Sequence, residues 1–132
     1  MRNPFFKEKS VSEGKENKIA ALNDRFREGF YIPSFGPRPV PGRIVCTSGI
    51  AALAPETQIC IWAQVANFTA FTEDNDPHGE RDFGAFEIAS VTEKIFWKID
   101  YYADASGTFG IDDPADITCC FRVLTIMLAS DY

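Results

Sequence analysis

The sequence has a single histidine and none of the short patterns that identify common catalytic sites. His78 lies between Pro77 and Gly79, where its ring would be exposed, so we expect a turn residue rather than an acid or base. No Gly-x-Ser-x-Gly elbow, glycine-rich phosphate loop, His-Glu-x-x-His helix or zinc-type spacing of Cys and His occurs. These absences make an enzyme the less favoured interpretation, and the sequence indicates no cofactor.

The sequence also lacks a cysteine-pairing pattern and an apolar targeting segment. The four cysteines show no C-x-x-C spacing, and two of them are adjacent, which disfavours a bridge between those two. The N-terminus has no apolar run long enough for a signal peptide, and no stretch approaches the length of a membrane span. We therefore expect a cytoplasmic protein with reduced thiols and no membrane partner.

Positive charge is scarce relative to negative charge. Thirteen Lys and Arg stand against 19 Asp and Glu, and the formal net charge is −6. A protein that binds phosphates electrostatically needs the opposite sign, so direct nucleic-acid binding is disfavoured. An acidic surface suits a basic protein partner, such as one whose positive groove normally holds nucleic acid, or it simply confers solubility.

The sequence does contain enough apolar material for one folded domain. Of its 132 residues, 45% are hydrophobic and 24% are charged, close to the globular average, and 14% are aromatic. We expect a flexible N-terminal arm at residues 1–14 and a single domain at 15–132. A proline-rich loop at 31–42 holds four of the eight prolines, and a stiff connector is favoured there over a ligand motif for another domain.

Hydrophobic periodicity predicts an α+β fold. Helices are expected at about 15–29, 55–68 and 117–129, and strands at 43–47, 83–88 and 93–102, the last two as a hairpin. A strand over residues 122–128 rivals the last helix, but Asp113-Pro114 looks like a helix start and favours the helix. The sum is a small antiparallel sheet of about three strands packed with about three helices.

A dense acidic turn at residues 74–82 immediately precedes the two aromatic strands. The strands would hold the carboxylates of this turn on a rigid edge, which makes it the candidate working surface. On the second strand alternate side chains point to opposite faces, one apolar and the other half polar. The predicted partner-binding residues are Asp74, Asp76, Glu80, Asp82, Asp100, Tyr101 and Tyr102.

Metal binding is an alternative use of the same turn. Asp74, Asp76 and Gly79 occupy the first, third and sixth positions of a calcium loop, but Ala85 stands where the bidentate Glu belongs. A less regular divalent site would support the alternative function, a metal-dependent hydrolase. Its ligands would be Asp74, Asp76, Glu80 and Asp82. A third interpretation is purely structural, with Asp74 and Asp82 capping backbone amides.

Two blocks of sequence carry a resemblance to a known family. Asp-Asn-Asp-Pro-His-Gly-Glu at 74–80 and Phe-Trp-Lys-Ile-Asp-Tyr-Tyr at 96–102 resemble a small bacterial family catalogued as a domain of unknown function, common in alphaproteobacteria, plasmids and prophages. The resemblance covers about residues 18–132, and the proline-rich loop and the adjacent Cys119 and Cys120 depart from it. The family implies no activity, but its mobile-element setting is one where small acidic proteins antagonise host defence.

Our leading hypothesis combines these observations. It is a small acidic protein-binding module, an anti-CRISPR-like inhibitor of a nucleic-acid-handling complex, whose carboxylates contact Lys or Arg on a basic protein partner. The hypothesis follows from the net charge of −6, from the clustered acids beside aromatic residues, and from the lack of a catalytic set.

Overall fold

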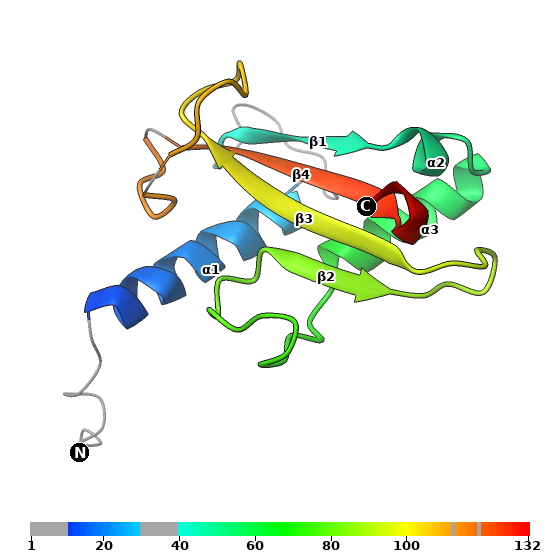
Figure 1. The fold of residues 1–132 in the computed structure, drawn as a ribbon, viewed down its shortest axis with the longest axis horizontal. Coiled ribbons are helices and arrows are strands. Elements are labelled where there is room, and N and C mark those ends of the chain that lie inside the picture. The colour runs from blue at the N-terminus through cyan, green and yellow to red at the C-terminus, as the bar shows by residue number, and fades with distance from the viewer. Residues whose placement is uncertain (1–10, 30–39, 112, 119) are drawn as a thin grey trace.

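The computed structural model describes residues 11–29, 40–111, 113–118 and 120–132. Over these residues the chain forms a four-stranded mixed sheet with helices, which confirms the predicted α+β class (Figure 1). Residues 1–10 of the predicted arm and residues 31–39 of the predicted proline-rich loop lie outside the described residues. Residues 11–14 of that arm belong to the first helix instead.

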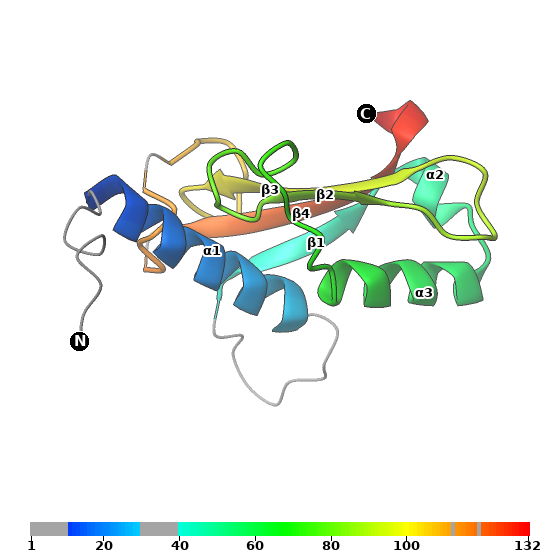
Figure 2. The same ribbon diagram turned by 90° about the horizontal axis from the view of Figure 1, so that it is seen from below.

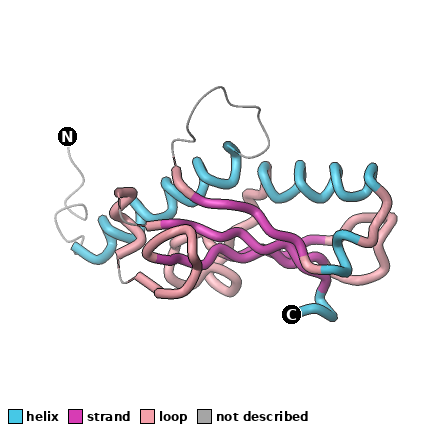
Figure 3. Tube along the Cα trace, turned by 90° about the horizontal axis from the view of Figure 1, so that it is seen from above, coloured by secondary structure: helices cyan, strands magenta, loops and turns pink. Residues whose placement is uncertain are grey.

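Two helices cover one face of the sheet, as the side views show (Figures 2 and 3). They are α1 (Val11–Gly29) and α3 (Pro55–Ala66), and they confirm the helices predicted at 15–29 and 55–68. α3 begins at a proline, which suits the first helical turn because that position needs no amide hydrogen. A short helix, α2 (Ser48–Ala51), follows the first strand. None of the helices in the described ranges has both the length and the apolar character that crossing a membrane requires.

The sheet has the strand order β1-β4-β3-β2. Its strands are β1 (Gly42–Cys46), β2 (Phe83–Phe86), β3 (Ile95–Tyr102) and β4 (Phe121–Leu128). β2 and β3 form the predicted antiparallel hairpin, β4 lies antiparallel to β3, and β1 lies parallel to β4. The sheet therefore has four strands and mixed pairing, where about three antiparallel strands were predicted.

The helix predicted at residues 117–129 is wrong, because Phe121–Leu128 forms the strand β4. The apolar residues of this segment fit a helical period and a strand equally well. The strand forms because β1 and β3 bond to its two edges, and because β-branched residues such as Val123 and Ile126 pack well in a central strand. Asp113 starts a turn, in which its carbonyl oxygen accepts from the amide of Asp116 at 3.1 Å.

The core lies between the sheet and the two helices. Trp97 of β3 and Leu124 of β4 are fully buried there, in agreement with the predicted apolar face of β3. Phe68 and Phe71 meet the Trp97 ring edge-on, with centroids 5.6 and 6.1 Å away. Gly84 lies opposite Trp97 in the hairpin, and a Cβ atom there would collide with the indole ring.

A buried arginine joins the two helices. Arg27 of α1 is 3% exposed, and its Nη1 donates to the carbonyl oxygens of Val65, Ala66 and Phe68 at 2.7, 3.1 and 3.0 Å. Carbonyls at the end of a helix lack intrahelical partners, and a cation also interacts favourably with that end of the helix dipole. Burial lowers the pKa of Arg27, while Asp24, 2.8 Å from Nη2, favours its charged form.

Candidate functional site

The predicted acidic turn lies within the connection between α3 and β2. We call residues 71–82 the acidic loop. Glu73 and Asp74 are its exposed acids, whereas Asp76, Glu80 and Asp82 are partly buried. Four of the predicted partner-binding residues, Asp74, Asp76, Glu80 and Asp82, therefore lie within this loop.

Hydrogen bonds within the acidic loop define its shape. The amide of Thr72 donates to Asn75 Oδ1 at 2.9 Å, and the amide of Asp76 donates to the Thr72 carbonyl at 2.8 Å. Asp76 Oδ1 in turn accepts from the amide of Arg81 at 3.0 Å. Gly79 and Arg81 both adopt positive φ, 67° and 56°, so the chain reverses sharply here. The loop is thus ordered by its own polar groups, and Asp76 has a structural role in it.

The acidic loop is attached to α1 by an ion pair. Arg81 Nη1 lies 2.7 Å from Asp24 Oδ2, and the second oxygen of the same carboxylate bonds Arg27. The Arg81 guanidinium also lies over the Phe71 ring, 5.3 Å from its centroid. Asp24 therefore bridges a buried and an exposed arginine, and Arg81 turns its charge toward the helix.

A groove of about 710 Å³ separates the acidic loop from α1. Ala20, Ala21 and Asp24 line it from the helix, and Glu73 and Asp76 are among the residues that line it from the loop. Its lining combines small apolar side chains with carboxylates, and it also includes Arg81. Such a groove can accept an extended, positively charged side chain, because the aliphatic stem packs on apolar surface while the charged end meets the acids.

Asp82 and Tyr101 belong to a polar network on the helix side of the sheet. Asn23 Nδ2 donates to Tyr101 Oη at 2.8 Å, and Tyr101 Oη donates to Asp82 Oδ2 at 3.3 Å. Asn23 Oδ1 accepts from the buried Arg122 Nε at 2.6 Å, and Asn23 Nδ2 also reaches the Glu80 carbonyl at 2.9 Å. The network connects α1, β3, β4 and the end of the acidic loop.

Burial sets the ionisation behaviour of this network. It raises the pKa of the Asp82 carboxyl, although the hydrogen bond from Tyr101 favours the charged form. It also raises the pKa of Tyr101, with a further contribution from the charge of Asp82, so the phenol stays protonated. These two residues anchor the loop from inside the molecule.

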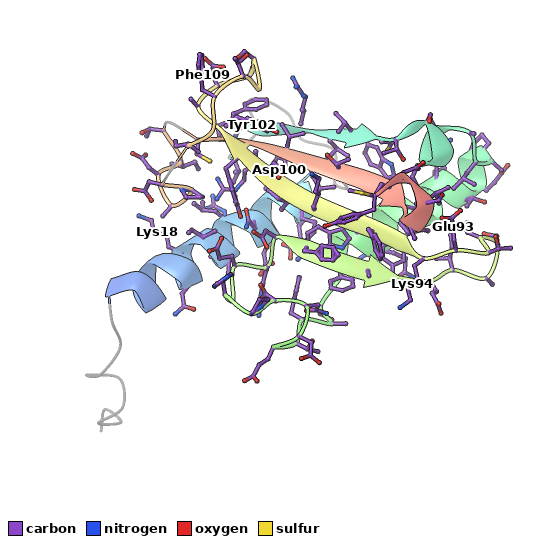
Figure 4. The ribbon with its side chains drawn as sticks, viewed as in Figure 1. Lys18, Glu93, Lys94, Asp100, Tyr102 and Phe109 are labelled. Atoms are coloured by element: carbon purple, nitrogen blue, oxygen red, sulfur yellow. The ribbon has the colours of Figure 1, made fainter. Side chains whose placement is uncertain are left out.

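Asp100 and Tyr102 point to the other face of β3, because successive side chains of a strand alternate. We call this side of the sheet, opposite α1 and α3, the open face. Figure 4 shows Asp100 and Tyr102 along β3, near the loop that carries the exposed Phe109. Asp100 Oδ2 pairs with Lys98 Nζ at 3.1 Å. The seven predicted partner-binding residues therefore do not share one surface. Asp74, Asp76 and Glu80 lie in the acidic loop, Asp82 and Tyr101 in the polar network on the helix side, and Asp100 and Tyr102 on the open face.

The alternative metal site does not acquire a ligand cluster. Among the residues that the structure describes, no group of three or more His, Cys, Asp or Glu side chains is placed to hold a metal ion. Two of the predicted ligands have other partners. Asp76 accepts a hydrogen bond from the backbone of its own loop, and Asp82 accepts one from the Tyr101 hydroxyl. His78 is an exposed turn residue.

Sequence reasoning missed the three buried polar residues that position this site, Asn23, Arg27 and Arg122. A signal was present, since Asn23 and Arg27 follow Ile19 at four-residue steps and so share the apolar stripe of the first helix. Polar residues on such a stripe are buried and need partners. The signal for a buried Arg122 was weaker: it is the single charged residue next to the apolar run of residues 123–128.

Comparison with known proteins identifies a family. A family model described as "Protein of unknown function (DUF3768)" matches residues 46–131, which include the acidic loop, β2, β3 and β4. Neither the curated proteins nor the solved structures contain a match to the chain.

Proposed function

Because the chain belongs to the DUF3768 family, whose description names no activity, we propose a function from the site: the chain is a cytoplasmic module that binds a basic protein through its acidic loop. The observation that carries the proposal is the ordered acidic loop beside the groove along α1. Glu73 and Asp74 of this loop are exposed. They offer the carboxylates that a Lys or Arg of the partner would contact.

The order of the loop favours binding. A loop already held by its own hydrogen bonds loses little conformational freedom when a partner docks, so more of the interaction energy appears as affinity. Arg81 is the basic residue of the loop, and its charge is directed to Asp24. The loop therefore presents an excess of negative charge, in a chain whose net charge is −6, and such a surface accelerates encounter with a positive one.

The finer part of the proposal concerns the partner. A protein complex that handles nucleic acid has a positively charged groove, and an acidic loop of defined shape can occupy such a groove in place of phosphates. The chain would then act as an inhibitor of a nucleic-acid-handling defence complex, which fits the mobile-element setting implied by the sequence resemblance. Inhibition by competition predicts that added single-stranded DNA displaces the module from its partner.

The test is a pull-down from native host lysate with a matched pair of charge variants. Glu73→Lys/Asp74→Lys reverses two exposed loop acids and avoids Asp76, whose carboxylate holds the loop together. The control, Glu56→Lys/Glu87→Lys, makes the same change in net charge at exposed positions outside the loop. Retained proteins are identified by mass spectrometry and then titrated at low and high salt.

We expect a basic protein to be retained by wild type and by the control, and to bind the loop variant about tenfold more weakly. Its affinity for wild type should fall with salt, because the contacts lie on the protein surface. Equal retention by the loop variant and the control would refute the assignment of the loop. No geometric observation in the described residues supports the metal-dependent hydrolase as a second proposal.

A further inference from the structure

Arg81, the basic residue of the acidic loop, begins next to the carboxylates of that loop. Its amide donates to Asp76 Oδ1 at 3.0 Å, and Arg81 lines the same groove as Glu73 and Asp76. The Arg81 side chain is 48% exposed, so burial alone does not fix its direction. A guanidinium that was free to turn at this position would pair with the carboxylates of the groove, because they are the opposite charges nearest to it along the loop.

Asp24 of α1 gives this guanidinium a fixed partner outside the loop. Arg81 Nη1 lies 2.7 Å from Asp24 Oδ2, while Asp24 Oδ1 lies 2.8 Å from Nη2 of Arg27, whose side chain is 2% exposed. Because Arg27 already holds the Asp24 carboxylate, only the Arg81 side chain has to be ordered when the exposed ion pair forms. The Phe71 ring, 5.3 Å from the guanidinium, adds a cation–π contact.

We propose that Asp24 is a positioning residue of the binding surface: it holds Arg81 against α1 and so keeps the carboxylates of Glu73 and Asp76 available to a basic partner. The inference rests on the proposed function of the acidic loop, and it makes that function depend on a residue 57 positions away from Arg81. If Arg81 turned toward the loop, its charge would neutralise a carboxylate of the groove. Its side chain would also fill space that a Lys or Arg of the partner needs.

Asp24→Asn should release Arg81 and leave Arg27 in place, because the two oxygens of Asp24 have different partners. An amide keeps one acceptor oxygen and replaces the other by an NH2 group, which only donates. The oxygen should stay with the buried Arg27, since an unpaired buried guanidinium costs more than an exposed one. The NH2 group then meets Arg81 donor to donor. Glu28→Gln is the matched control, because it removes one charge from an exposed acid of the same helix.

Binding is measured with a fluorescein-labelled octalysine peptide and the full chain, by fluorescence anisotropy at low salt. Asp24→Asn should bind the peptide about tenfold more weakly than wild type, and Glu28→Gln about twofold more weakly. In chains that carry Arg81→Gln, the cost of Asp24→Asn should fall to about threefold, because no cation remains to be released.

NMR spectroscopy follows the Arg81 side chain directly and does not depend on binding. Wild type should show nuclear Overhauser contacts between Arg81 and the Phe71 ring, and Asp24→Asn should lose them. Circular dichroism establishes whether Asp24→Asn is folded. Should it fail to fold, wild type with bound octalysine decides the question: the contacts between Arg81 and Phe71 must persist in the complex, and their loss would refute the positioning role of Asp24.

Three results would overturn the proposal: equal weakening by Asp24→Asn and Glu28→Gln, an undiminished cost of Asp24→Asn beside Arg81→Gln, or contacts between Arg81 and the Phe71 ring that survive in Asp24→Asn. A different result would refute the proposed function itself, namely equal binding of octalysine by wild type and by Glu73→Lys/Asp74→Lys. The NMR comparison would then still decide whether Asp24 directs Arg81, which separates the two failures.

Discussion

Replacing Asn23 by alanine should lower the free energy of unfolding by about 3.5 kcal/mol. Asn23 is 0% exposed and forms hydrogen bonds with three different elements. Its Nδ2 donates to the Glu80 carbonyl at 2.9 Å and to Tyr101 Oη at 2.8 Å, and its Oδ1 accepts from Arg122 Nε at 2.6 Å. Alanine removes all three bonds and leaves their partners behind.

The expected loss of stability is the sum of the costs of leaving each hydrogen-bond partner of Asn23 without it. The bond to Arg122 is charge-assisted and buried, so its loss costs about 2 kcal/mol. The Tyr101 hydroxyl keeps its hydrogen bond to Asp82 but no longer accepts one from Asn23, and this loss costs about 1 kcal/mol. The Glu80 carbonyl belongs to a half-buried residue, where water can replace the amide, and its loss costs about 0.5 kcal/mol.

The assay is urea denaturation followed by circular dichroism, with the midpoint and the m-value fitted separately. Asn17→Ala is the matched control, because Asn17 is exposed on the same helix, and it should change the free energy by less than about 0.5 kcal/mol. Tyr101→Phe removes only the hydroxyl and should cost about 1 to 2 kcal/mol. If Asn23→Ala costs less than about 1 kcal/mol with an unchanged m-value, the network does not stabilise the fold as argued.

Three further predictions concern other buried groups. Burial raises the pKa of Asp82, so as pH falls the folded chain binds a proton at Asp82 before the unfolded chain does. Wild type should therefore gain stability relative to Asp82→Asn as pH falls from neutral toward about 4. Parallel curves of unfolding free energy against pH for the two proteins would contradict this. Gly84→Ala should cost about 2 kcal/mol because its Cβ meets the Trp97 indole, whereas Gly110→Ala, where nothing lies within 4 Å, should be near neutral in thermal unfolding. Arg27→Met removes the guanidinium donor from three carbonyls at and just beyond the end of α3 and should cost about 3 kcal/mol. A loss comparable to that of Gly110→Ala would refute the capping role of Arg27.

The acidic loop could be predicted from the sequence, but its attachment could not. The density of Asp and Glu and the Pro-His-Gly turn are local features, and they place the loop correctly before β2. The residues that hold it are distant in the chain: Asn23 meets Tyr101 across 78 positions and Arg122 across 99. No local pattern encodes which polar groups meet in a core, because that depends on how the elements pack.

The separation of Tyr101 from Asp100 and Tyr102 also could not be predicted in full from the sequence. Alternation along a strand predicts that Tyr101 faces away from Asp100 and Tyr102. It does not predict that α1 covers the face of Tyr101 and leaves the other face open, as the side views show. Tyr101 thereby becomes a buried anchor, while Asp100 pairs with Lys98 on an accessible surface.

By itself the sequence determined the α+β class, the helices of residues 15–29 and 55–68, the hairpin of β2 and β3, and the excess of negative charge. Each of these depends on neighbours within a few residues, where hydrophobic period and turn chemistry act directly. Only the tertiary structure decided that residues 121–128 form a strand, since β1 and β3 supply hydrogen bonds to both of its edges. Strand pairing joins segments far apart in the chain, and those long-range contacts outweighed a local pattern that fitted a helix equally well.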